Sequence, residues 1–415
     1  MKRLILFVIL IVGLMTAFLF SPRLAPELEE QYCVKIHDAW ERRVHLIVNC
    51  DSRRFLYLAR HPLAVLTLEH RLWQSRPIYP LIGFVLALPI RAVLGPFGGE
   101  STVVPEYAAF VVLNAILLAA SVALAQRLLG AGSPLDAWMI FPVTMLLVNE
   151  LTKPFFWTPH LQIFNIAVPI GSVALYAWLR PRRGALSGRQ FAGLGLLLGI
   201  ASLAYGAVIV TAIGAFFCAL LGGSSSRTPI AMTTRLRDAG VMVLSFVAPI
   251  VAWFFVVVAR LGSFFSRETE EYRQFVWVLD AAREGVFVPR LLQHLGTFLD
   301  LSIVVTLFPG IALVIALLIR GASGATHPQD AAERDLRFGL LLYLIAAVLF
   351  FAPMGYYATR NLWSLVPPIV LLLGLELRAL ALATSGRRRT LLSAALVTIS
   401  GVYVVYWVVR RGPWA

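Results

Sequence analysis

Apolar segments long enough to cross a lipid bilayer recur along the whole chain and restrict its fold more than any other feature. A helix needs about 20 mainly apolar residues to span the hydrocarbon core. The apolar runs cover residues 4–20, 74–95, 105–129, 135–149, 162–179, 191–221, 239–260, 300–319, 338–353, 362–378 and 391–409. They do not alternate as barrel strands do. The sequence therefore predicts an all-α polytopic transmembrane helical bundle of about 11 to 13 helices, a single domain over residues 1–415.

The charge composition supports a membrane protein and argues against nucleic-acid binding. Only 14% of the residues are charged, against about 25% in soluble proteins. The net charge of +14 comes almost entirely from arginine, and these arginines cluster in short loops between apolar runs. Such loops set membrane topology and meet anionic lipid head groups. No RNA-binding, DNA-binding or phosphate-cradling glycine motif is present, so membrane lipids are the expected partners.

Basic residues also predict which side of the membrane each loop occupies. The N-terminal Lys2 and Arg3 precede an apolar run without a cleavage site, which indicates an uncleaved first helix with a cytoplasmic start. Residues 21–76 then form a first extracytoplasmic loop carrying interfacial helices, one of them expected over 28–48, and residues 261–299 form a second one. Three arginine-rich loops are expected in the cytoplasm: 180–190, 227–237 and 385–389.

Two runs do not fit a simple count of spans. Three crossings between residues 95 and 180 would place Arg180 outside, against the positive-inside rule, so one of 105–129, 135–149 and 162–179 should not cross. The run 191–221 is too long for one span, which predicts two short helices that meet near Tyr205 and Gly206.

The sequence does not decide whether the two cysteines of the first loop form a disulfide. Cys33 and Cys50 both lie there, and outside the cytoplasm they could form a disulfide. Two free thiols are the alternative. Cys218 lies in an apolar run and is expected to be a packing residue.

The main candidate for a catalytic residue is Asp51, a carboxylate among arginines in the stretch NCDSRRFLYLARHP (49–62). A carboxylate near an acceptor hydroxyl can take its proton as a general base. Arginines bind phosphate through paired charge-assisted hydrogen bonds. Together they suit glycosyl transfer from a lipid phosphate, with Asp51 as the base and inversion at the anomeric carbon. The other reading of Asp51 is a helix N-cap, and the two are compatible.

Four stretches resemble the GT-C superfamily of membrane glycosyltransferases. DSRRFLYLA (51–59) is similar to its D-x(5)-Y-x-A pattern in the first external loop, and SRPIYPLIG (75–83) to the start of its second helix. GLGLLLGIASLAYGAVIV (193–210) and YYATRNLWSLVPPIVLLL (356–373) resemble two later segments. The resemblance implies a polyprenyl-phosphate-linked sugar as donor, a glycan or glycolipid as acceptor, an active site on the extracytoplasmic side of the cytoplasmic membrane and Asp51 as the base.

Two departures from the family pattern refine this expectation. Many members carry paired acids where Asp51 stands alone, and the late motif reads Arg360-Asn361 instead of Arg-Tyr. Paired acids often accompany a metal, so no cofactor is expected and a divalent metal is disfavoured. The first-loop histidines also lack metal-site spacing. Mannose or arabinofuranose is the expected class of sugar.

Further candidate residues lie at the predicted membrane edges. Glu150 is a rival base, or an ion-pair partner of Lys153 at helical spacing. The remaining candidates for binding the substrate and its phosphate are Arg60, His61, Arg76, Lys153, His160, Tyr357 and Arg360. The arginines could instead extend toward lipid head groups.

A different class of function also fits a polytopic chain. A transporter or flippase of a lipid-linked intermediate would carry ionisable residues near the middle of its spans. Here the apolar runs are nearly free of acids, and polar residues gather toward one face, which favours surface chemistry. A membrane scaffold without activity is the third possibility, and it predicts that Asp51→Asn has no effect.

Overall fold

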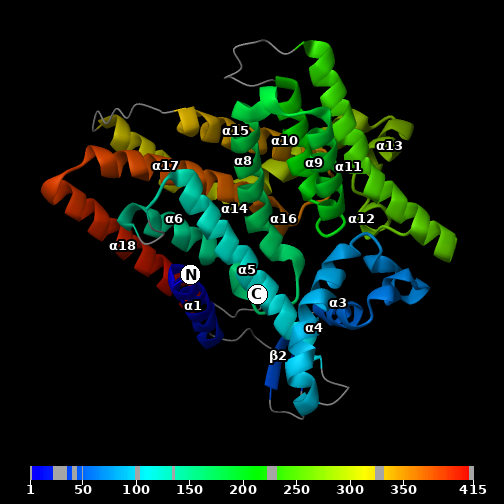
Figure 1. Cartoon of the computed structure of the whole chain (residues 1–415). Coiled ribbons are helices and arrows are strands. Elements are labelled where there is room, and N and C mark those ends of the chain that lie inside the picture. Colours follow the sequence, from blue (N-terminus) through cyan, green and yellow to red (C-terminus); the bar gives the residue numbers. More distant parts are fainter. Residues whose placement is uncertain are drawn as a thin grey trace. The chain divides into compact units, whose positions relative to one another are not determined.

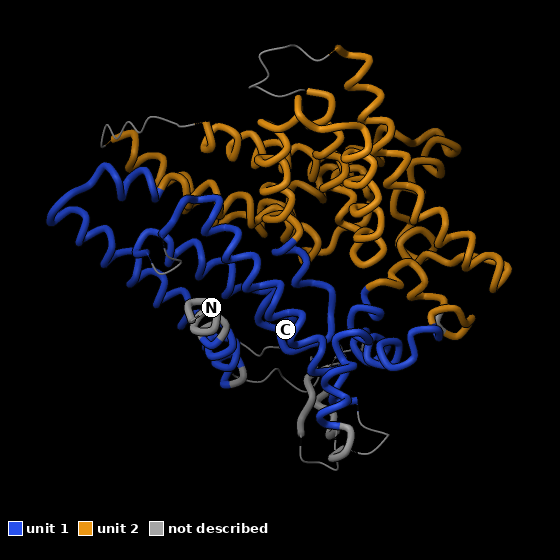
Figure 2. Tube along the Cα trace, viewed as in Figure 1, with its two compact units in different colours: residues 1–64, 79–167, 377–415 blue, residues 65–78, 168–376 orange. Residues whose placement is uncertain are grey.

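The computed structural model describes residues 2–21, 35–39, 44–48, 50–98, 103–132, 136–221, 231–322 and 331–410. The chain forms two compact units (Figure 2). Unit 1 consists of residues 1–64, 79–167 and 377–415, and unit 2 of residues 65–78 and 168–376.

Helices dominate the described part of the chain, as the sequence predicts (Figure 1). Six helical stretches in this part are long and apolar enough to cross a membrane, which indicates a membrane protein. Three of them are α5 (Val104–Leu129), α11 (Met232–Leu261) and α14 (Phe287–Ala322). The other three are Leu161–Ala185, which contains α8 (Phe164–Arg182); Thr359–Ala383, which contains α16 (Thr359–Leu362) and α17 (Val366–Ala383); and α18 (Gly386–Val409).

Unit 1 combines apolar helices with a small hairpin. Its other helices are α1 (Lys2–Ala17), α3 (Cys50–Arg60), α4 (Ile78–Gly98), α6 (Ala137–Leu147) and α7 (Thr152–Phe155). The helix α6 has 11 residues and is therefore about 16 Å long, roughly half of the hydrocarbon core. The run 135–149 is thus the one that is too short to cross as a helix.

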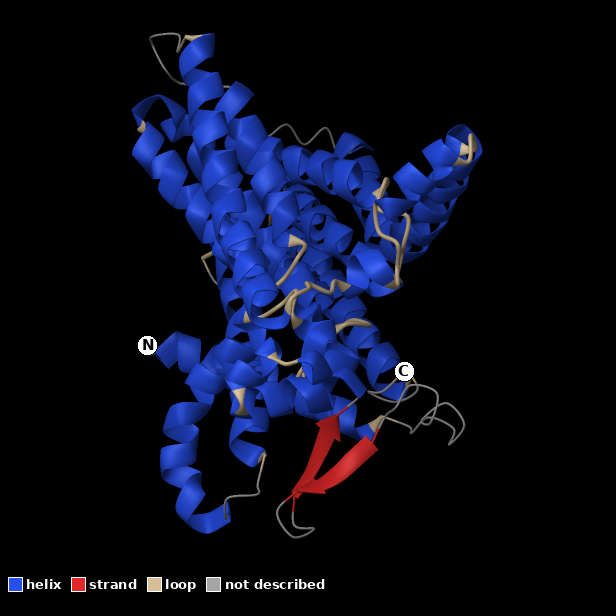
Figure 3. Ribbon diagram, turned by 90° about the vertical axis from the view of Figure 1, so that its right-hand side faces the viewer, coloured by secondary structure: helices blue, strands red, loops and turns tan. Residues whose placement is uncertain are grey.

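The helix predicted over residues 28–48 is wrong where the structure describes it. Two antiparallel strands, β1 (Lys35–Ala39) and β2 (Val44–Val48), form a hairpin there (Figure 3). Ile36 is the register partner of Ile47, and Lys35 that of Val48. The spacing of apolar residues suggested a helix, but the β-branched isoleucines and valines favour extended backbone. Cys33 lies outside the described residues, and the structure describes only the backbone of Cys50, so the choice between a disulfide and two free thiols is untested.

Unit 2 contains the predicted broken helix. The helix α9 (Gly188–Ser202) ends before Tyr205, and α10 (Val208–Leu221) begins after Gly206, which confirms the predicted break. Four further helices complete the unit: α12 (Arg267–Glu270), α13 (Val276–Arg283), α15 (Ala331–Phe351) and the residues of α8 from Val168 onward.

Two glycines let α9 approach α11 closely. A Cβ atom on Gly195 would collide with the carbonyl of Met242, and one on Gly199 with the carbonyl of Phe246 and the ring of Pro249. Small residues four apart are the usual means by which membrane helices bring their backbones together.

Gly199→Ala is therefore expected to destabilise the protein by about 1–3 kcal/mol, the usual cost of overpacking. Gly193→Ala is the matched control, because a Cβ atom on Gly193 of the same helix meets open space. The measurement is the thermal unfolding midpoint of both variants in detergent. Equal midpoints for the two variants would contradict this account of the packing.

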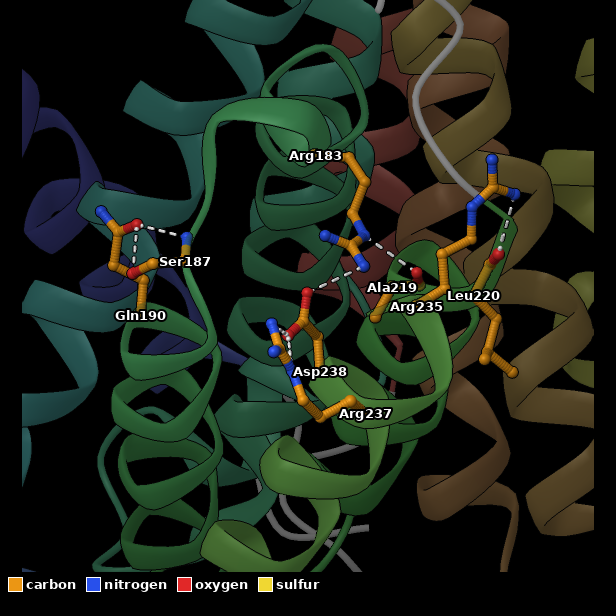
Figure 4. Close-up of polar contacts among 8 residues, drawn as sticks. All are labelled: Arg183, Ser187, Gln190, Ala219, Leu220, Arg235, Arg237 and Asp238. Carbon is orange, nitrogen blue, oxygen red and sulfur yellow. Dashed lines mark hydrogen bonds and ion pairs between the residues drawn. The ribbon is translucent and has the colours of Figure 1, made fainter. Parts of the chain in front are cut away.

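Arginines tie several helix ends of unit 2 together (Figure 4). The buried Arg183, just beyond α8, donates from Nε to the carbonyl of Ala219 at 2.8 Å and pairs through Nη2 with Asp238 at 3.2 Å. Arg180 pairs with Asp335 near the start of α15. One end of α8, α10, α11 and α15 thus carries a cluster of arginines, which we call the arginine end.

Candidate functional site

The helix α3 carries Asp51 in its first turn, at a partly exposed position. Ser52, Phe55 and Ala59 recur at helical spacing and are buried, whereas Arg53 and Tyr57 are exposed on the opposite face. Packing of the buried face fixes the direction in which the N-terminal turn points. A carboxylate there is favoured by the helix dipole. The side chain of Asp51 keeps 34% of its surface exposed.

His160 is the partner of Asp51 within unit 1. Its Nε2 lies 3.5 Å from Oδ2 of Asp51, and its side chain is only 5% exposed. The ring lies 4.7 Å from that of Phe155 and 6.2 Å from that of Phe55, measured between centroids. Two of the predicted site residues, which lie in distant parts of the sequence, are thus brought together. A carboxylate and an imidazole in this arrangement can pass and stabilise a proton.

The loop that carries His160 is held by a buried asparagine. Asn114 of α5 donates from Nδ2 to the carbonyls of Phe155, Phe156 and Thr158 at 2.9–3.3 Å. Tyr107, about two turns earlier on the same face of α5, donates to the carbonyl of Trp157 at 2.5 Å. Asn114 was not predicted as a site residue. Its signal in the sequence is an amide near the middle of the apolar run 105–129, whose other amide, Gln126, lies close to the end of the run.

The other end of α3 is fixed by an arginine of α4. Arg91 donates to the carbonyl of Ala59 at 3.2 Å and pairs with the buried Glu106 of α5 at 2.6 Å. A cation beside the last carbonyls of a helix also complements its dipole. The ion pair therefore positions the whole of α3, and with it Asp51. Sequence reasoning missed both residues of the pair.

Glu150 and Lys153 lie in unit 1, and the charge of Arg410 acts on both of them. Lys153 donates from Nζ to the carbonyls of Trp407 and Arg410 at the C-terminal end of α18. Burial, and then the charge of Arg410, lowers the pKa of Lys153 to about 8. Burial raises the pKa of Glu150, and the charge of Arg410 opposes this. A raised pKa brings a carboxylate closer to the range that suits a general base.

Arg60 and His61 close the C-terminal end of α3. Arg60 occupies its last turn. The ring of His61 lies 4.9 Å from that of Tyr57, on the exposed side of the helix.

Three predicted residues belong to unit 2, where a cavity of about 390 Å³ lies. Arg76 lines this cavity and pairs with Glu268 at 2.6 Å. Arg360 lies in α16 beside Asn361, which also lines the cavity. Tyr357 instead donates its hydroxyl to the carbonyl of Ala352 at 2.5 Å. Glu268 is a further polar residue that sequence reasoning missed.

Among the described residues there is no group of three or more His, Cys, Asp or Glu side chains that could hold a metal ion. Cys218 is buried and free. In comparisons with known proteins, no family model, no curated protein and no solved structure matches this chain.

Proposed function

We propose that this chain is an inverting membrane glycosyltransferase that takes a sugar from a polyprenyl-phosphate donor. The observation that carries the proposal is the partly exposed carboxylate of Asp51, in the first turn of α3 and 3.5 Å from the buried His160. The candidate membrane spans and the motifs of the GT-C type support the same assignment. The proposed fold is a GT-C-like bundle of about 11 to 13 helices.

The proposed reaction needs one base and a cationic site for the leaving group. Asp51 takes the proton of the acceptor hydroxyl, whose oxygen forms a bond to the anomeric carbon while the carbon–oxygen bond to phosphate breaks. The polyprenyl phosphate leaves with the bonding electrons, and Arg60, which belongs to unit 1 together with Asp51, stabilises its charge. His160 orients the carboxylate and stabilises the proton. Attack opposite the leaving group inverts the anomeric carbon.

The proposed orientation of unit 2 puts its cavity on the extracytoplasmic side, the side that the resemblance implies for the active site. The arginine end of unit 2 lies at the starts of α11 and α15 and at the end of α10. The residues that these helices contribute to the cavity lie toward their opposite ends: Trp253 on α11, Phe351 on α15 and Ile209 on α10. Because arginine-rich loops stay in the cytoplasm, the cavity would open toward the extracytoplasmic side. Mannose or arabinofuranose is the proposed sugar, and a glycan or glycolipid the acceptor.

The test is sugar transfer by membranes that contain the full-length protein. Membranes with and without the protein are incubated with radiolabelled polyprenyl-phosphate mannose or polyprenyl-phosphate arabinofuranose, and a membrane glycan extract supplies the acceptor. We expect protein-dependent label in the glycan or glycolipid fraction from one donor. Consumption of neither donor would contradict the proposed reaction.

One observation favours a second candidate, a flippase for a lipid-linked intermediate. Broken helices that line a cavity are typical of transporters, and the break between α9 and α10 lines the cavity with Tyr205, Gly206 and Ala207. A flippase moves the labelled lipid between leaflets of a proteoliposome without cleaving its sugar. Leaflet exchange that needs the protein, without transfer, would favour this candidate.

A further inference from the structure

The cavity of unit 2 has apolar walls and one charged edge. Its volume of about 390 Å³ falls in the range of small-molecule sites, roughly 300–1,000 Å³. Aromatic and aliphatic side chains form most of its lining, which includes Trp253, Phe254, Phe264, Phe350, Phe351 and Ile209. Charged side chains reach it only through Arg76 and Glu268 among its lining residues. Such a cavity is suited to a molecule that is apolar along most of its length and charged at one end.

The backbone beside Arg76 is held firmly by two neighbouring segments. The indole nitrogen of Trp253, on α11, donates to the carbonyl of Gln74 at 2.7 Å. The side-chain oxygen of Gln74 accepts a hydrogen bond from the amide of Phe265 at 3.3 Å. Arg76 is thereby presented at the edge of the cavity by a fixed chain, as a binding group should be.

The carboxylate of Glu268 pairs with the guanidinium of Arg76 as the anionic group of a ligand would. The Nη2 atom of Arg76 lies 2.6 Å from Oε1 of Glu268, while Ser266 donates its hydroxyl to Oε2 at 3.2 Å. Burial raises the pKa of Glu268, but the charge of Arg76 and hydrogen bonds from the backbone, Ser266 and Arg76 outweigh it, so the pKa lies below its ordinary value. The carboxylate is therefore ionised at neutral pH. Both side chains keep part of their surface exposed, 32% for Arg76 and 23% for Glu268, so an outside anion can reach the pair.

We propose that this cavity binds an amphipathic phosphate, and that Glu268 is an internal competitor which the phosphate displaces from Arg76. The apolar chain lies against the aromatic walls, and the phosphate forms charge-assisted hydrogen bonds with the guanidinium. Glu268 keeps the arginine neutralised when the cavity holds no lipid. A ligand must therefore provide both the anion and the apolar chain to open the pair. The inference rests on the proposed function only in taking a lipid phosphate as the natural ligand.

The test measures binding of radiolabelled dodecyl phosphate to the full-length protein in lipid nanodiscs, without any transfer reaction. Unlabelled dodecyl phosphate should compete, whereas inorganic phosphate and dodecanol should compete at least about tenfold less well. Arg76→Gln should weaken binding by about tenfold or more, since a hydrogen bond to a charged group is lost. Glu268→Gln should tighten it several-fold, because the competing charge is gone.

Glu271→Gln is the matched control, since the exposed Glu271 pairs with Arg267 at 2.8 Å and does not line the cavity. It should bind as the unchanged protein does. Weaker or equal binding by Glu268→Gln would overturn the role of Glu268 as a competitor. Equal competition by inorganic phosphate or by dodecanol would overturn the amphipathic site, and this competition is measured on the unchanged protein, so it does not depend on the folding of a variant.

The same assay separates this inference from the proposed function. Asp51→Asn should bind dodecyl phosphate normally, because Asp51 is not among the residues that line the cavity. Binding without sugar transfer by the unchanged protein would keep the site and reject the enzyme. Transfer without such binding would keep the enzyme and reject the site.

Discussion

Asp51→Asn is expected to slow sugar transfer by about 10²–10⁴-fold, the usual contribution of a general base. The asparagine amide has nearly the same shape as the carboxylate but cannot accept the acceptor's proton. The N-terminal turn of α3 should remain intact, because the substitution removes only the favourable interaction of the carboxylate with the helix dipole, about 0.3–1 kcal/mol. The measurement is the initial rate of transfer from the radiolabelled polyprenyl-phosphate donor, normalised to the amount of folded protein in the membrane.

Asp300→Asn is the control for this substitution. Asp300 is an exposed aspartate on α14, away from α3 in the sequence and outside unit 1. Its replacement should leave the transfer rate unchanged. An unchanged rate for a well-folded Asp51→Asn variant would remove Asp51 as the base, and Glu150 would then be the next carboxylate to replace.

Helices were predictable from the sequence where hydrophobicity alone decides the structure. The break in the run 191–221 was predicted from the length of the run. The structure has it between the end of α9 and the start of α10, around Tyr205 and Gly206. The choice among the three runs before Arg180 did not follow, because only the structure shows that α6 has 11 residues. The hairpin of β1 and β2 was missed because apolar residues at mixed spacing fit a helix as well as a strand.

The candidate site was predictable residue by residue, but its contacts were not. The local sequence singles out Asp51 as a carboxylate among arginines, and His160 as a histidine at a membrane edge. Their 3.5 Å contact depends on how α3 packs and on Asn114, which holds the loop of His160. The pair of Arg76 and Glu268 joins residues 192 positions apart, a separation at which helical spacing carries no information.

The arginine end of unit 2 contains a buried pair on which the packing of several helices depends. Arg183 and Asp238 are each only 2% exposed, and the guanidinium lies 4.6 Å from the ring centroid of Phe191. Taking both charges out of water is costly, and their attraction together with the hydrogen bond from Arg183 to Ala219 offsets this cost. If one partner is removed, the other remains as an uncompensated charge in a buried site.

Asp238→Ala is therefore expected to destabilise the protein by about 3–5 kcal/mol, the usual effect of breaking a buried ion pair. Arg237→Ala is the matched control, because Arg237 also pairs with Asp238 but is 67% exposed, and exposed pairs contribute about 0–1 kcal/mol. The measurement is the thermal unfolding midpoint in detergent for each variant. The double variant Arg183→Met with Asp238→Leu should recover most of the loss, because it leaves no charge behind. If the double variant were as unstable as Asp238→Ala, the loss would come from packing volume and not from the unpaired guanidinium.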